Sequence, residues 1–162
     1  MKKDGERGHV KRVLVLGLGN PILSDDGVGI RVARRLRDFN LPADILEASA
    51  AGFRVVDEII GYDRLVLVDA VMTGRVAPGT LHRFSFDDFS RALHNTSPHD
   101  ISLFQAFEIM RREGEKLPET IAIYGIEIAD SSTFSEELTP AVEAAVEHIA
   151  QVIRREQFPP TD

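Results

Sequence analysis

Apolar positions along the chain follow two different spacings. Short, continuous apolar runs are typical of strands buried on both faces, and they occur at residues 13–17, 65–69 and 120–126. A further strand is expected at about residues 44–47. Apolar residues at helical spacing occur at residues 26–39, 53–60, 98–112 and 140–153. Because strands and helices alternate, the pattern predicts an α/β fold with a mostly parallel sheet that helices cover on both faces.

One connection is too short for a parallel crossover. Ten residues, including the turn signal Pro78-Gly79, separate the strand at residues 65–69 from a strand expected at residues 80–84. A parallel crossover needs about a dozen residues or more. We therefore expect the second of these strands to run antiparallel to the first. The helix at residues 98–112 then starts at the carboxyl ends of the parallel strands.

Length and composition are those of an ordinary soluble domain. The chain has 162 residues, of which 43% are apolar and 28% charged, so we expect a single domain over 1–162 with its core at about 12–153. No apolar run approaches the roughly 20 residues of a membrane-spanning helix. The charged N-terminal stretch leads directly into a strand rather than into a signal-peptide core. A cytoplasmic protein without a membrane partner is expected.

Cysteine count and charge exclude several function classes. The chain contains no cysteine, which excludes disulfides, thiolate nucleophiles and cysteine-ligated metals. The net charge of −7 argues against binding to nucleic acid, because neutralising phosphates requires a basic surface. Any chemistry must use carboxylates, histidines, hydroxyls or a borrowed cofactor.

Two aspartates are candidates for that chemistry, since ligands of open α/β sheets bind at the carboxyl ends of the strands. Asp69 ends an apolar strand, where it is either a turn former or a rigid, partly desolvated functional acid. Asp25 and Asp26 lie in the loop after the first strand. We expect Asp25 to be the N-cap of the following helix, which leaves Asp26 in its first turn as the functional candidate.

His99 is the third candidate. Ser97 is a suitable N-cap, Pro98 suits the first helical position, and His99 then lies in the first turn, near the positive end of the helix dipole. The alternatives are a surface histidine or His94 as the ligand in its place. Two carboxylates and one imidazole with open positions suit nickel, zinc or manganese.

Common nucleotide-binding and hydrolase motifs fit poorly or are absent. Gly17-x-Gly19 follows a strand, but Ile22 replaces the third glycine of a dinucleotide-binding loop. The sequence contains no phosphate-binding P-loop, no GxSxG motif of serine hydrolases and no HExxH motif of zinc peptidases.

Several ordered motifs resemble the hydrogenase maturation proteases. They are GLGNPILSDDGVG (17–29), LVLVDAV (65–71), APGTLHRF (77–84), SPHDISL (97–103), YGIEI (124–128) and ELTPAVEAAV (137–146). The resemblance covers roughly residues 12–153. It implies an aspartic-type endopeptidase that trims the C-terminus of a [NiFe]-hydrogenase large-subunit precursor.

The resemblance also implies roles for individual residues. Asp26, Asp69 and His99 match the family's metal-contacting residues, and we expect them to be the catalytic residues as well. The metal is the nickel already inserted in the precursor, contacted transiently, and no organic cofactor is implied. The implied fold is a phosphorylase/hydrolase-like three-layer sandwich, whose twisted five-strand sheet contains one antiparallel strand. The expected partner is the precursor, and a monomer is expected.

One loop departs from the family pattern. After the second strand the family usually carries a loop resembling Asp-Gly-Gly-Thr, whereas residues 47–52 read EASAAG. Glu47 is a conservative change of the acid and a candidate contributor to the cleft. The departure favours a rival hypothesis, a non-catalytic metal-sensing binding module or chaperone of the same fold. A nucleotide- or flavin-binding α/β protein is a weaker third hypothesis.

Overall fold

The computed structural model describes residues 10–49, 53–93 and 98–161. These residues form a five-stranded sheet with the strand order β2-β1-β3-β5-β4. Its strands are β1 (Val13–Leu18), β2 (Asp44–Ala48), β3 (Arg64–Val71), β4 (Leu81–Phe84) and β5 (Thr120–Glu127). All neighbouring strands pair in parallel except β4, which is antiparallel to β5.

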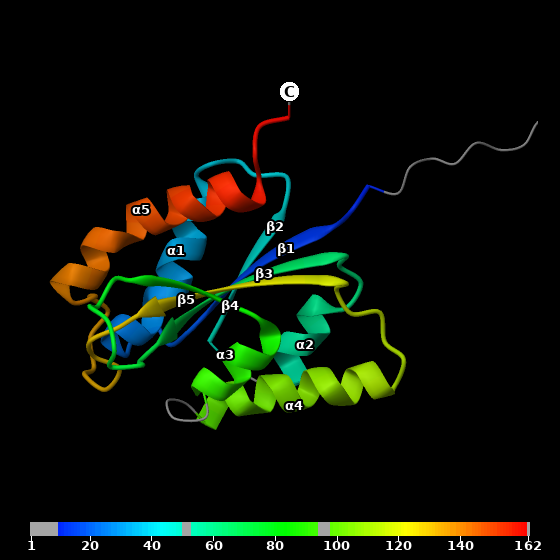
Figure 1. The fold of residues 1–162 in the computed structure, drawn as a ribbon, viewed down its shortest axis with the longest axis horizontal. Helices are drawn as coiled ribbons and strands as arrows, with labels where there is room; N and C mark the ends of the chain where they lie inside the picture. Colours follow the sequence, from blue (N-terminus) through cyan, green and yellow to red (C-terminus); the bar gives the residue numbers. More distant parts are fainter. Residues whose placement is uncertain (1–9, 50–52, 94–97, 162) are drawn as a thin grey trace, which may run out of the picture.

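Helices cover both faces of this sheet, which gives three layers (Figure 1). On one face lie α1 (Val28–Arg37) and α5 (Pro140–Gln157), and a 3₁₀ turn, η1 (Ser24–Gly27), leads into α1. On the other face lie α2 (Phe53–Ile59), α3 (Phe86–Leu93) and α4 (Pro98–Arg112). The predicted α/β architecture, with a mostly parallel sheet and one antiparallel strand, is confirmed.

Two apolar cores explain why the strands are apolar without interruption. Successive side chains of a strand point to opposite faces. In β3, Val66 and Val68 therefore pack against α1 and α5, whereas Leu65 and Leu67 pack against α2 and α4. A strand that is buried on both faces needs apolar residues at every position.

The structure corrects two details of the strands. β3 continues to Val71, so Asp69 lies within the strand and not at its end. The antiparallel direction of β4 is confirmed, but its neighbour is β5 and not β3. In that arrangement the turn at Pro78-Gly79 reaches across β5, and the backbone N–H of Gly79 donates to the carbonyl oxygen of Glu127 at 2.8 Å.

The start of α1 differs from the prediction, whereas the start of α5 agrees with it. α1 begins at Val28 after η1, so Asp26 lies in the 3₁₀ turn and not in the first α-helical turn. α5 begins at Pro140 as predicted, with Thr139 in the N-cap position. The Thr139 hydroxyl makes no capping hydrogen bond, because it donates to Asp25 Oδ2 at 2.8 Å.

The sheet has two edges that differ in what they carry. We call the loops after β1, β3 and β5 the carboxyl edge (residues 19–23, 72–80 and 128–139). The amino edge consists of the segments before β1, β2, β3 and β5 (residues 10–12, 38–43, 60–63 and 113–119). The segment after α4 lies at the amino edge, where the Lys116 carbonyl oxygen accepts from the backbone N–H of Gly61 at 2.9 Å.

The direction of α4 follows from this contact. α4 has 15 residues, and a helix of that length spans about 22 Å, which is close to the length of the strands it covers. Its first turn therefore lies at the carboxyl edge, as predicted (Figure 1). Within the described residues, no helix is long and apolar enough to cross a membrane.

Candidate active site

The loop after β1 places Asp26 at the carboxyl edge. Asp26 is half-buried in η1, and its Oδ2 accepts a hydrogen bond from the backbone N–H of Asn20 at 3.0 Å. The loop folds back so tightly that a Cβ on Gly19 would lie 2.0 Å from the carbonyl oxygen of Asp26. Gly19 also has a φ of +148°, which favours glycine. The backbone of this loop therefore fixes the position of Asp26.

Asp25 has a structural role that differs from the predicted N-cap. Its side chain is completely buried and makes no capping bond to η1 or α1. Instead, its carboxylate accepts hydrogen bonds from the backbone N–H groups of Ala129 (3.0 Å), Asp130 (3.1 Å) and Thr139 (2.7 Å), in addition to the Thr139 hydroxyl. Asp25 thus fastens the loop after β1 to the loop after β5.

Asp69 lies on the face of the sheet that α2 and α4 cover. It alternates with Leu67 and Val71, which both pack in the core on that face. The residue is only 3% exposed, and one carboxylate oxygen, Oδ1, accepts from the backbone N–H of Ala70 at 2.8 Å. A carboxylate held in a strand with this little exposure is rigid and partly desolvated, which suits a functional acid.

Asp26 and Asp69 belong to neighbouring strands. β1 and β3 pair in parallel, with Gly17 opposite Val68, and η1 packs against β3. Gly29 permits a close approach here, because a Cβ on it would lie 2.5 Å from the carbonyl oxygen of Val68. The fold therefore brings the segments that carry the two predicted carboxylates together at one edge.

His99 lies in the first turn of α4. α4 begins at Pro98, as the capping pattern predicts, and this turn lies at the carboxyl edge. The side chain of His99 is outside the part of the chain whose side chains the structure describes, and so is His94, the alternative ligand. The backbone agrees with the predicted placement of His99, and its contacts stay a prediction.

Glu47 lies away from Asp69. In β2, Leu46 and Ala48 pack on the α2 and α4 face, so Glu47 points to the opposite face. There its carboxylate pairs with Arg34, at 3.0 Å, and with Arg37. Burial raises the pKa of Glu47, but the hydrogen bonds from these arginines outweigh it, and the net shift is downward. Glu47 therefore holds α1 against β2. Residues 50–52 of the atypical loop lie outside the described part of the chain.

Glu127 is a buried acid whose role the sequence analysis did not identify. It ends β5, is 1% exposed, and accepts from the backbone N–H groups of Thr73 (3.0 Å) and Gly74 (2.8 Å). His82 Nε2 lies 3.1 Å from its Oε2. The available signal was an acid in the apolar run YGIEI, the same signal that identified Asp69. Glu127 fastens the loop after β3 to β5.

The carboxyl edge has the donor types for a divalent metal. Carboxylate oxygens and a neutral imidazole are donors that nickel accepts. Among the side chains that the structure describes, no group of three histidines, cysteines or acids is close enough to hold a metal ion. Any site that uses Asp26 and Asp69 therefore needs a donor beyond these described side chains, and His99 is the predicted one.

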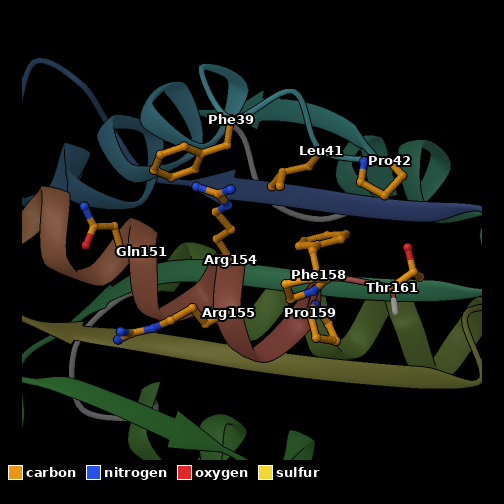
Figure 2. Close-up of a pocket in the computed structure, with 10 residues that line it drawn as sticks. Phe39, Leu41, Pro42, Gln151, Arg154, Arg155, Phe158, Pro159 and Thr161 are labelled. Carbon is orange, nitrogen blue, oxygen red and sulfur yellow. The ribbon is translucent and has the colours of Figure 1, made fainter.

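A groove at the amino edge lacks such donors (Figure 2). It has a volume of about 490 Å³ and lies between the segment after α1 and the end of α5. Figure 2 shows the guanidinium of Arg154 directed toward the ring of Phe39, whose centroid is 4.9 Å away. Among the residues that the structure describes, no acid or histidine lines this groove, so these residues offer no general base for hydrolysis.

Comparisons with known proteins agree with this fold. The chain is 32% identical over 140 residues to the hydrogenase 2 maturation protease of Escherichia coli (strain K12), covering 84% of each chain. The structure of a hydrogenase maturating endopeptidase, HybD from E. coli, matches with a TM-score of 0.77 and 28% identity, over 91% of this chain and 94% of that one. The [NiFe] hydrogenase maturation protease HybD from Thermococcus kodakarensis matches with a TM-score of 0.72 and 25% identity, over 90% and 98% of the two chains.

A family model extends these pairwise similarities. The model described as hydrogenase maturation protease matches residues 30–156, which include β2 to β5 and α2 to α4 completely. The match contains Asp69 and His99, whereas Asp26 lies just before it. The chain therefore belongs to the hydrogenase maturation protease family and is a peptidase.

Proposed function

We propose that this peptidase removes the C-terminal extension of a [NiFe]-hydrogenase large-subunit precursor after nickel has been inserted. In this proposal Asp26, Asp69 and His99 contact the nickel of the precursor and form the catalytic site. The observation that carries the proposal is the nearly complete burial of Asp69 in β3, beside the strand whose loop holds Asp26. Family membership supports the reaction class.

The chemistry of the donors supports nickel recognition. Nickel in the precursor is part of the substrate, so the peptidase needs open donor groups rather than a closed metal site of its own. Two carboxylates and an imidazole supply such donors. Asp26 keeps Oδ2 oriented by the backbone N–H of Asn20, and Asp69 keeps Oδ1 oriented by the backbone N–H of Ala70.

Peptide hydrolysis here also needs an activated water, because the chain has neither a cysteine nucleophile nor the GxSxG motif of serine hydrolases. A carboxylate beside the scissile bond accepts a proton from the attacking water as a general base. We assign this role to one of the two aspartates. We also propose that the enzyme acts as a monomer in the cytoplasm, without an organic cofactor.

The test compares nickel-loaded and nickel-free precursor. Each is incubated with the peptidase, and the intact mass of the large subunit is measured. We expect loss of the C-terminal extension only from the loaded precursor. Equal trimming of both forms would exclude nickel recognition, and binding of the loaded precursor without any loss of mass would support the non-catalytic module instead.

A matched pair of variants tests the site. Asp69→Asn removes a buried carboxylate at the carboxyl edge, whereas Asp38→Asn removes an exposed one that pairs with Arg35. We expect a loss of trimming of about 100-fold or more for Asp69→Asn and none for Asp38→Asn. Wild-type trimming rates for both variants would exclude Asp69 from the site.

A further inference from the structure

Exposed apolar side chains are concentrated at the carboxyl edge. In the described part of the chain, six large apolar residues are exposed. Four of them, Ile22, Met72, Val76 and Phe134, lie on the loops after β1, β3 and β5. The amino-edge segments and the last turns of α4 carry the other two, Val10 and Ile109.

Phe134 stands out because its ring is 82% exposed although its loop is well fixed. The backbone of the next residue, Ser135, accepts from Ser24 N–H at 2.8 Å and donates to the carbonyl oxygen of Ile22 at 3.0 Å. On the other side, Asp130 accepts from the backbone N–H groups of Ser132 (2.9 Å) and Thr133 (3.0 Å). Phe134 is therefore exposed on a loop whose backbone is fixed by hydrogen bonds.

Ile22 is brought next to Phe134 by the same contacts. The bridge between Leu23 and Ser135 joins the two loops, and Ile22 is 47% exposed on its side of the bridge. Two large apolar side chains on backbone-paired segments form one surface feature, which we call the apolar pair (Ile22 and Phe134). Neither residue contributes to the two apolar cores.

The apolar pair has the properties of an interface anchor. Large aromatic side chains dominate the binding energy of protein interfaces, and a side chain that is already ordered loses little entropy on binding. Exposed apolar side chains that lie together, rather than scattered singly, are typical of protein interaction sites.

We propose that Ile22 and Phe134 dock the substrate protein by inserting into an apolar recess on the folded surface of the hydrogenase large-subunit precursor. This inference rests on the proposed function. The occupant follows from position, because Ile22 lies in the same loop as Asp26, four residues away. A specific interface covers about 800 Å² on each partner, so a folded protein whose C-terminal segment reaches Asp26 also covers Ile22 and Phe134.

The test measures KM and kcat separately for trimming of the nickel-loaded precursor. Phe134→Asp and Ile22→Asp put a charge into the proposed contact, and we expect Phe134→Asp to raise KM about tenfold or more with kcat unchanged. The matched controls are Val10→Asp and Ile109→Asp, at residues that are 85% and 43% exposed. Both controls should keep the wild-type KM.

Each outcome bears on one proposal. If the wild type does not trim the precursor, the proposed function fails, and docking is then read from the affinity of wild type and Phe134→Asp for the intact precursor by biolayer interferometry. A wild-type KM, or a wild-type affinity, for Phe134→Asp overturns the docking inference. The docking inference is also overturned if the wild type is a dimer and Phe134→Asp dissociates it without a change in KM. The surface then binds a second copy of this chain. If Phe134→Asp fails to fold, Phe134→Ser replaces it. A wild-type KM for Phe134→Ser would likewise overturn the docking inference.

Discussion

Two acids next to the loops of the carboxyl edge, Asp25 and Glu127, are buried, whereas two ion pairs at the amino edge are open to water. At the carboxyl edge Asp25 and Glu127 have relative exposures of 0% and 1%. Near the amino edge the side chains of the Arg12–Asp44 ion pair are 55% and 60% exposed, and in the Lys116–Asp63 pair Lys116 is 57% exposed although Asp63 is only 14% exposed. The charges of Asp25 and Glu127 are thus enclosed by the protein, whereas each of these ion pairs keeps at least one partner in water.

This difference in burial indicates which loops the fold must hold rigid. An exposed ion pair contributes only about 0–1 kcal/mol and tolerates movement. A buried carboxylate is unfavourable unless several donors satisfy it, so Asp25 and Glu127 are compatible with folding only while the neighbouring loops keep their positions. Asp25 fixes the loops that carry Asp26 and Phe134 in this way, as expected if this edge binds and cuts the partner as we propose.

The largest loss of stability is expected when Asp25 is replaced. Asp25→Ala removes a fully buried carboxylate that is the acceptor for three part-buried backbone N–H groups, so we expect a loss of about 3–5 kcal/mol in the free energy of unfolding. Lys116→Ala at the amino edge should cost about 1 kcal/mol or less. Urea unfolding at pH 7 measures both. Equal losses for the two variants would remove the contrast between the edges.

Gly19 gives the next largest effect. Gly19→Ala adds a Cβ at 2.0 Å from the Asp26 carbonyl oxygen, at a φ of +148°, and we expect a loss of about 2–4 kcal/mol. Gly114 is the matched control at the amino edge, since it has a φ of +79° with no atom within 4 Å of the added Cβ. Gly114→Ala should cost only about 1 kcal/mol. Thermal unfolding of both variants compares them, and a Gly114→Ala that is the less stable of the two would contradict the argument.

A smaller effect is expected for Glu127. Glu127→Gln keeps an amide oxygen for the N–H groups of Thr73 and Gly74, which both donate to Oε1, but these hydrogen bonds lose the carboxylate charge and an NH₂ group replaces Oε2 beside His82 Nε2. We expect a loss of about 1–2 kcal/mol. Hydrogen exchange at Thr73 and Gly74 should accelerate in the variant. The surface control is Glu156→Gln, whose partner Arg83 is more than half exposed. Unchanged exchange at both amides would show that Glu127 does not hold this loop.

The smallest effect is a pH dependence at Asp130, beside Phe134. The hydrogen bond from the Thr133 hydroxyl, with those from the backbone N–H groups of Ser132 and Thr133, lowers the pKa of Asp130 from its usual value to about 2. A lowered pKa in the folded state stabilises the protein above the unfolded-state pKa, and this contribution is lost as pH falls toward 2. The stability difference between wild type and Asp130→Asn should therefore be constant from pH 7 to 5 and shrink below about pH 4. A stability difference between the two proteins that grows toward low pH would contradict a lowered pKa of Asp130.

Much of the fold could be predicted from the sequence because its signals are local. β1 and β3 are buried on both faces, and that condition alone produces their continuous apolar runs. The short connection before β4 required an antiparallel strand. Asp69 was identified because an acid at the end of such a run is unusual, although the strand continues to Val71.

The remaining features depend on contacts between distant positions. Asp25 was expected to cap α1, but its acceptor oxygens are used by Thr139, 114 residues further along the chain. A local capping rule does not contain this partner. For Glu47, the alternation along β2 places the side chain on the α1 face, opposite to that of Asp69.

The most direct test of the central claim measures the intact mass of nickel-loaded precursor after incubation with wild type and with His99→Ala. His99 lies in the first turn of α4, and we expect the variant to keep the wild-type stability in urea. We predict that wild type removes the C-terminal extension and that folded His99→Ala leaves the mass unchanged. Trimming by His99→Ala at the wild-type rate would contradict a catalytic site at the carboxyl edge built from Asp26, Asp69 and His99.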